Sequence, residues 1–162
     1  MSSKRIDTGN TQVRRNRKYE SIVERLCNRK CAYSKRPIFQ YNKDLMVFAA
    51  MVGYTMEITE ELEPDSIQIV LSTYASDEKD GFIYLIALLK EKTATVLKDD
   101  KIAESVKYFE KYCNGGLSVI QEWLEENPGD SEGVDTLADK IYEQILENNK
   151  VIGGADRPDV EF

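Results

Sequence analysis

The chain has 162 residues, of which 41% are hydrophobic and 31% are charged. This length suits one compact domain with a substantial core, and the supply of apolar residues excludes collagen-like and wholly disordered proteins. No apolar run reaches the roughly 18 residues of a membrane-spanning helix, and the first twenty residues lack the hydrophobic segment of a signal peptide. We therefore expect a soluble cytoplasmic protein without a membrane partner.

Histidine is absent, which removes the commonest general base, the imidazole metal ligand, and the Ser/His and Cys/His nucleophile pairs. The three cysteines, Cys27, Cys31 and Cys113, are an odd number, so we expect reduced, buried thiols rather than a disulfide framework. Without histidine they cannot complete a four-ligand zinc set. We therefore predict no catalytic residue, no bound metal and no cofactor.

Charge is strongly segregated along the chain. The first 43 residues hold 12 Lys and Arg against three acids, a net charge of +9, whereas the remaining 119 residues carry −16. A basic segment beside an acidic body suits a polyanion, because the acidic body suppresses binding elsewhere on the surface. The pattern indicates either nucleic acid or an acidic protein partner. The cations expected to contact DNA phosphates are Arg14, Arg15, Arg17, Lys18, Arg25, Arg29, Lys30, Lys35 and Arg36.

The N-terminal part of the chain predicts an arm followed by two helices. Residues 1–16 lack apolar periodicity, so we expect a disordered basic arm. From Tyr19 to Cys27 apolar residues recur with helical spacing, and cations occupy the outer face. The next stretch, interrupted by Pro37, interleaves aromatic residues with cations, as nucleic-acid-binding surfaces do. Residues 43–54 are apolar almost all round and form the expected central helix, with Phe48 as its most buried residue.

The middle of the chain predicts one extended segment and several helices. Residues 67–71 alternate like a short strand, and helical periodicity follows over 82–92 and 101–113. The sequence Asn114-Gly115-Gly116 is expected to end the second of these helices, because glycine readily adopts the positive φ of a helix C-terminus. A short separate helix from Leu117 to the Asn127-Pro128 boundary is expected to follow.

A strong final helix is predicted over residues 134–149, with Ile141 packed toward the central helix, before a flexible tail at 150–162. The sequence thus predicts a mainly α protein. Its folded part, residues 17–149, is expected to be a single compact helical domain of about six helices with a short extended segment, preceded by the mobile basic N-terminal arm.

A weak nuclease pattern is also present. Pro64-Asp65 precedes Asp77-Glu78-Lys79, which fits an arrangement in which two carboxylates hold a metal and a lysine assists phosphodiester cleavage. Both groups fall in acidic loops of a mostly helical chain, so solvated loop charges are the better interpretation. A metal-dependent nuclease therefore ranks third among the candidate functions.

Two stretches of the chain resemble the Dnd system-associated protein 4 family. The first begins with Arg17-Lys18-Tyr19-Glu20, continues through Pro37-Ile38-Phe39 and ends with the helix 43–54 at Gly53-Tyr54. The second is the aromatic-rich segment 109–117, which ends in Asn-Gly-Gly-Leu and carries cysteine where a small residue such as alanine is expected. The resemblance spans residues 17–126.

The resemblance implies a prokaryotic protein of a DNA phosphorothioation system, in which sulfur replaces a non-bridging phosphate oxygen and companion proteins restrict unmodified DNA such as that of phages. With the charge pattern, it predicts a non-catalytic DNA-binding accessory protein whose partners are double-stranded DNA and other proteins of the system. The alternative is a protein-interaction adaptor or regulator that binds an acidic companion through its basic N-terminal region. Whether the chain forms a homo-oligomer is left open.

Overall fold

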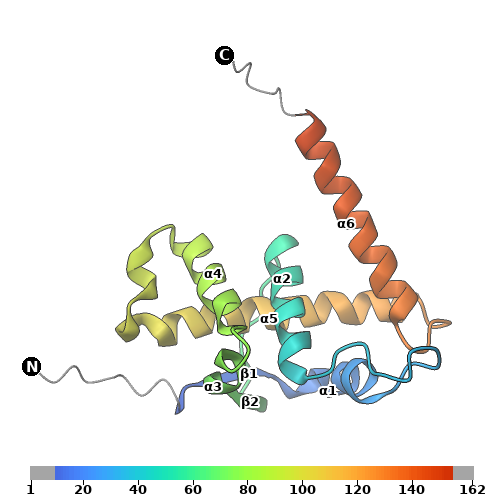
Figure 1. The fold of residues 1–162 in the computed structure, drawn as a ribbon, viewed down its shortest axis with the longest axis horizontal. Helices are drawn as coiled ribbons and strands as arrows, with labels where there is room; N and C mark the ends of the chain where they lie inside the picture. The colour runs from blue at the N-terminus through green and yellow to red at the C-terminus, as the bar shows by residue number, and fades with distance from the viewer. Residues whose placement is uncertain (1–9, 155–162) are drawn as a thin grey trace, which may run out of the picture.

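The computed structural model describes residues 10–154, and within that range the protein is mainly helical, as the sequence predicts (Figure 1). No helix within those residues combines the length and the apolarity that a membrane span requires. Four short helical turns join the main elements, three of 3-10 type at Arg17–Tyr19, Ala94–Leu97 and Asp99–Lys101 and one π-helical turn at Glu24–Asn28. The main elements in chain order are β1 (Gln12–Asn16), α1 (Glu20–Val23), α2 (Asn42–Thr55), β2 (Ser66–Val70), α3 (Leu71–Ala75), α4 (Asp80–Glu91), α5 (Ile102–Glu126) and α6 (Val134–Gly154).

Two short strands form an antiparallel pair. In this pair Val13 lies opposite Ile69 and Arg15 opposite Ile67, so β2 confirms the extended segment expected at 67–71. Successive side chains of a strand point to opposite faces. Val13 and Arg15 accordingly point into the core, while Arg14 is exposed. The expected disordered arm is therefore wrong from residue 12 onward, because those residues pair with β2, and residues 1–9 lie outside the described part.

Two side chains of α5 fix β1 against the helices. The backbone N–H of Arg14 donates to a Glu110 carboxylate oxygen at 2.9 Å, and that of Asn16 donates to the Asn114 side-chain oxygen at 2.8 Å. Both α5 side chains are buried, with Glu110 7% exposed and Asn114 fully enclosed. Burial raises the pKa of Glu110 to about 7, although the Arg14 hydrogen bond and charge act in the opposite direction.

The Glu110 carboxyl should make the fold less stable as the pH rises. The pKa of Glu110 is higher in the folded state than in the unfolded state, because burial disfavours the ionised carboxylate. The free-energy cost of burying that carboxylate is therefore absent below pH 4.5, grows between pH 4.5 and 7, and is complete above pH 7. Glu110→Gln is therefore expected to raise the free energy of unfolding by about 2–3 kcal/mol at pH 8.5 and to change it little at pH 4.5. Urea denaturation of both proteins at the two pH values checks this. A gain of equal size at both pH values would contradict it.

Helices α2 and α5 cross at the centre of the fold, at a point where both carry glycine (Figure 1). A Cβ atom on Gly116 would lie 1.7 Å from the Ala49 carbonyl oxygen, and one on Gly53 would lie 2.1 Å from the Tyr112 carbonyl oxygen. Contacts this short are compatible only with hydrogen at both positions. The two helix backbones therefore touch, with no side chain between them at this crossing.

The expected helix end at Asn114-Gly115-Gly116 is wrong. Helix α5 runs without interruption through these residues for 25 residues, and the short separate helix expected from Leu117 is its second half. Glycine inside a helix costs roughly 1 kcal/mol relative to alanine. Here that cost is offset by close packing, because Gly115 lies against the backbone of Ile58 as Gly116 lies against that of Ala49.

The core contains a different aromatic residue from the one expected. Phe109 of α5 and Tyr74 of α3 are both fully buried and meet edge to face, with ring centroids 5.9 Å apart. Phe48, expected to be the most buried residue, is only partly buried and packs against Phe39, 5.3 Å away between ring centroids. The reason is that α2 turns its Ala49–Ala50 side toward α5 and leaves Phe48 at the margin of the contact.

The start of the final helix, α6, is attached to the core, and the helix then projects from the body (Figure 1). The Asp130 carboxylate accepts hydrogen bonds from the backbone N–H groups of Gly133 and Thr136, at 3.0 and 2.8 Å, and Leu137 is buried in the core. Further along, Ile141 is 44% exposed, so its expected packing toward the central helix is wrong. The helix extends to Gly154, five residues into the expected tail, and residues 155–162 lie outside the described part.

Candidate nucleic-acid interface

Arg15 lies in the interior and is not available to DNA. Its side chain is 1% exposed, and one guanidinium nitrogen, Nη2, lies 2.9 Å from a Glu20 carboxylate oxygen. Its Nε and Nη1 atoms are buried without a hydrogen-bond partner among the described residues. A strand places alternate side chains on one face, so Arg15 enters the core beside Val13. We therefore remove Arg15 from the set of phosphate-contacting candidates.

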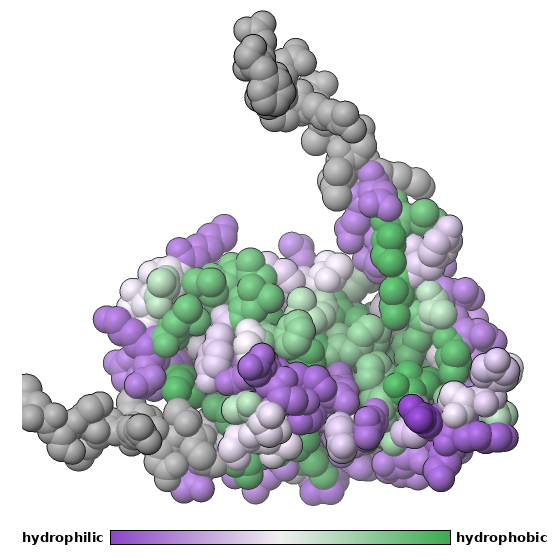
Figure 2. All heavy atoms as spheres, viewed as in Figure 1, coloured by the Kyte–Doolittle hydropathy of each residue, from purple (hydrophilic) through white to green (hydrophobic). Residues whose placement is uncertain are grey.

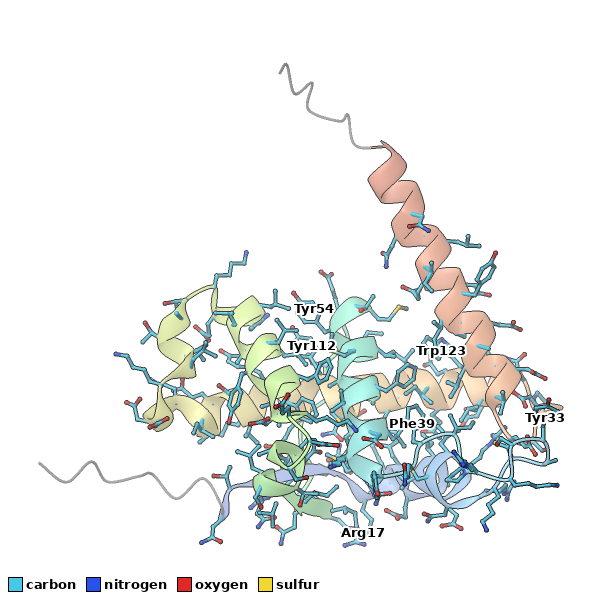
Figure 3. All side chains as sticks on the ribbon, in the orientation of Figure 1. Arg17, Tyr33, Phe39, Tyr54, Tyr112 and Trp123 are labelled. Atoms are coloured by element: carbon cyan, nitrogen blue, oxygen red, sulfur yellow. The ribbon has the colours of Figure 1, made fainter. Side chains whose placement is uncertain are left out.

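Arg17 and Lys18 are exposed but already paired with acids. The Arg17 Nε atom lies 2.7 Å from an Asp65 carboxylate oxygen, and the Lys18 Nζ atom lies 2.6 Å from Glu60 and 2.8 Å from Glu63. The hydrogen bonds to Glu60 and Glu63 raise the pKa of Lys18 above its ordinary value. Figure 3 shows Arg17 at the lower edge of the molecule. These carboxylates reduce the positive field that a phosphate would meet there.

Glu60 joins the acidic loop to the N-terminal segment. Its carboxylate accepts hydrogen bonds from the Tyr19 hydroxyl at 2.5 Å and from the Asn16 side-chain nitrogen at 2.9 Å, besides the ion pair with Lys18. Burial opposes ionisation of Glu60, but these three donors outweigh it and lower its pKa. Lys18 and Tyr19 thus stabilise the fold, and part of the basic segment serves to hold the chain together.

Arg25 and Arg29 reach toward the loop that precedes α6. The Arg25 guanidinium donates to the carbonyl oxygens of Asp130 and Ser131, the latter at 3.1 Å, and Arg29 Nη1 donates to the Ser131 carbonyl at 3.5 Å. Arg25 is partly buried, whereas Arg29 is exposed. Arg25 therefore fixes the start of α6, while most of the Arg29 side chain stays accessible.

Apart from Arg14, the remaining predicted cations lie on one loop, residues 29–36, which we call the basic loop. It is closed by a hydrogen bond from the Cys31 N–H to the Arg36 carbonyl at 2.9 Å and one from the Lys35 N–H to the Cys31 carbonyl at 3.0 Å. Lys35 has a φ of 59°, which is uncommon for a residue with a side chain and marks a tight turn. Lys30, Lys35 and Arg36 are exposed and form no ion pair with any described residue.

Tyr33 occupies the tip of the basic loop and is 100% exposed. Figure 3 shows it at the outer end of the loop, on the side of the molecule where α6 begins. A fully exposed tyrosine contributes nothing to the core, and aromatic rings beside cations can pack on bases or sugars while the cations bind phosphates. Arg14 is also exposed and unpaired among the described residues, but it lies on β1 rather than on this loop.

An acidic segment lies across from the base of the basic loop. Asp130, Glu132 and Asp135 line a cavity of about 540 Å³ together with residues of the loop, including Tyr33 and Arg36. The Glu132 carboxylate also accepts a hydrogen bond from a backbone N–H of the loop, that of Ala32, at 2.6 Å. The acids therefore support the loop at its backbone, while its cationic side chains form no ion pair with any residue from 10 to 154.

Of the nuclease pattern, Asp77 and Lys79 form an ion pair, whereas Asp65 is paired with a residue outside the pattern. Asp65 pairs with Arg17 at the start of β2, whereas Asp77 lies after α3 and is 3.0 Å from both Lys43 and Lys79. Within residues 10–154 no three Asp, Glu or Cys side chains are grouped so as to hold a metal ion.

The three cysteines are buried free thiols, as predicted. Burial raises the pKa of Cys27 to about 11 and that of Cys113 to about 12, although the nearby Arg15 charge acts in the opposite direction. Thiols with raised pKa values are poor nucleophiles at neutral pH. The cysteines therefore belong to the core.

Comparison with known proteins agrees with the resemblance noted in the sequence. The family model described as DNA sulphur modification system-associated protein 4 matches residues 12–150, which include every element from β1 to most of α6. A search of the curated proteins and a search of the solved structures each gave no significant match. Because the family match covers most of the chain, the chain belongs to the family of DNA sulphur modification system-associated protein 4, and it is associated with a DNA sulphur modification system.

Proposed function

We propose that the chain is a non-catalytic accessory protein that contacts double-stranded DNA through the basic loop. The observation that carries the proposal is the group of three exposed, unpaired cations, Lys30, Lys35 and Arg36, around the fully exposed Tyr33. Within residues 10–154 these four side chains form no hydrogen bond or ion pair. Their exposure therefore favours a role outside the fold, in the cytoplasm where the DNA of the system lies.

Contacts of this kind position a protein on DNA without reading its sequence. Lysine and arginine bind phosphates, which every duplex presents, so we expect affinity for unrelated sequences to be similar. The net charge of −7 and the acids of the body oppose binding elsewhere, so the basic loop sets the orientation. An accessory that holds duplex DNA in this way can keep it near the other proteins of the system.

Binding of duplex DNA should weaken steeply with salt. If Arg29, Lys30, Lys35 and Arg36 each neutralise one phosphate, counterion release gives a slope of about −3.6 in log affinity against log salt, or roughly a hundredfold loss between 50 and 200 mM salt. Fluorescence anisotropy with a labelled duplex of unmodified DNA measures this slope. An undetectable interaction at 50 mM, or one insensitive to salt, would contradict the proposal and favour the adaptor alternative.

A variant with a matched control locates the contact. Lys30→Gln, Lys35→Asn and Arg36→Gln together remove three charges, and asparagine suits the positive φ at residue 35. We expect about a tenfold to hundredfold weaker binding at 50 mM salt and a smaller salt slope. The control removes three exposed cations that form no ion pair among the described residues, by Lys90→Gln, Lys98→Gln and Lys107→Gln, and should bind nearly as the parent does. Equal losses in both variants would mean that overall charge, and not the loop, governs binding.

A further inference from the structure

Helix α6 carries a row of exposed apolar side chains along one side. Ile141 is 44% exposed, Tyr142 62%, Ile145 51% and Leu146 42%, and Val134 at the start of the helix is 41% exposed. These four residues lie seven, eight, eleven and twelve positions after Val134. Positions with this spacing fall on one face of an α-helix. Figure 2 shows them as a continuous hydrophobic band on the projecting helix. Single exposed apolar residues are normal, but a contiguous row marks an interaction surface.

A ladder of carboxylates borders this apolar row. Asp135, Asp139, Glu143 and Glu147 recur every four residues and are all exposed. Residues four apart on a helix lie above one another, so the four acids form one edge of the apolar row. Lys140 pairs with Glu143 at 3.4 Å, and the other three acids form no ion pair with any described residue.

We propose that α6 is a docking surface for an amphipathic helix of another protein, with an apolar face that covers the row and lysine or arginine residues that lie along the acidic ladder. Charge complementarity is the argument for this occupant. The exposed apolar row can be covered by the apolar face of an amphipathic helix. The four acids along one edge of the row favour a partner helix with cations on the flank that lies against them. Val134 and Asp135 at the start of α6 also line the cavity beside the basic loop, but the rest of this surface lies further along the helix, and the proposal does not depend on DNA binding.

The segments of the chain outside the structure do not fit this surface. Residues 1–9 include only two large apolar side chains, Met1 and Ile6, which is too few for a helix face. Residues 155–162 carry three acids against one arginine, so they would be repelled by the ladder. Neither of these two segments therefore suits the surface.

A second copy of α6 is also a poor occupant. Two antiparallel copies related by a two-fold axis would place acidic edge against acidic edge, which is destabilising. Two parallel copies would place the acidic ladder of one copy against the non-acidic flank of the other. The only cation on that flank among the described side chains is Lys140, which is already paired with Glu143. Neither arrangement neutralises four acids, whereas a basic helix does.

The test uses a pair of designed peptides. Both are 18-residue amphipathic helices with a leucine face, one with lysine and the other with glutamate along the flank, and each is fluorescently labelled and titrated with the full chain. We expect the lysine peptide to bind and the glutamate peptide to bind at least about tenfold more weakly. Equal affinity for the two peptides would overturn the proposal, because the ladder would then select nothing.

Variants of the chain assign the binding to α6. Ile141→Ser with Ile145→Ser should weaken binding of the lysine peptide by about tenfold or more, since both side chains lose apolar contact. The control, Leu85→Ser with Leu89→Ser, changes two leucines of α4 that are 41% and 40% exposed and should leave binding unchanged. An equal effect of the control would overturn the assignment to α6.

Reversing the charge of the ladder should exchange the preference. Asp139→Lys with Glu147→Lys is expected to weaken binding of the lysine peptide and to strengthen binding of the glutamate peptide. The control, Glu122→Lys with Glu126→Lys on α5, should change neither affinity.

Sedimentation velocity of the parent and of the Ile141→Ser, Ile145→Ser variant tests the second copy as occupant. Self-association of the parent that this variant abolishes would overturn the proposal, because α6 would then bind itself.

Discussion

Gly116→Ala is expected to destabilise the protein by about 3 kcal/mol or more. The new methyl group would lie 1.7 Å from the Ala49 carbonyl oxygen and 2.5 Å from its carbonyl carbon, and both atoms belong to the backbone of α2. A flexible side chain could move aside, but here one whole helix has to shift against the other. The free energy of unfolding from urea denaturation measures the effect.

Gly81→Ala is the matched control for this substitution. Gly81 lies in the first turn of α4, and a Cβ atom there would meet no atom within 4 Å. The same change should therefore leave stability unchanged or raise it by up to about 1 kcal/mol, because alanine favours the helix and restricts the unfolded chain. A Gly116→Ala protein as stable as the parent would mean that α2 and α5 do not cross at backbone contact.

The same glycines explain why the sequence predicts the long helices but divides α5 into two, while it misses the short helix α3. Glycine is typical of helix ends and also of close helix contacts, and the Asn-Gly-Gly triplet favours the first interpretation. The better signal is phase: Phe109, Cys113, Leu117 and Ile120 keep the spacing of four, four and three residues across the glycines, and all four are buried. Helical periodicity that continues in phase through a glycine pair indicates one helix.

Strand β1 was not predictable from its own residues. Residues 12–16 include two arginines and an asparagine, and a local pattern of this kind is typical of an exposed arm. What makes it a strand is remote in sequence: its pairing with β2 and the hydrogen bonds from Arg14 and Asn16 to Glu110 and Asn114, about a hundred residues away. Long-range partners of this kind leave no periodic signal in a single sequence.

The sequence shows where the cations proposed for the interface lie along the chain, but not what surrounds them in the fold. The sequence locates the cations in the first 43 residues, but it does not tell which of them meet acids in the fold. Arg17 and Lys18 pair with carboxylates more than forty residues away, and Arg15 enters the core. Lys35 and its neighbours stay unpaired because a tight turn holds them out from the body. The free positive charge of the interface is therefore smaller than the sequence total.

Phe109→Ala is expected to lower the free energy of unfolding by about 3–5 kcal/mol, because the truncation removes a fully buried ring and leaves a cavity beside Tyr74. Phe48→Ala removes the same atoms from a partly exposed site next to Phe39, where solvent can fill the space, so its cost should be clearly smaller. Urea denaturation of the two variants, side by side with the parent, compares the sites directly. Which of the two variants loses more stability depends on which helix supplies the centre of the core. The larger loss expected for Phe109→Ala assigns the centre to the Phe109 side of α5. A larger loss for Phe48→Ala would instead make α2 the element around which the others pack.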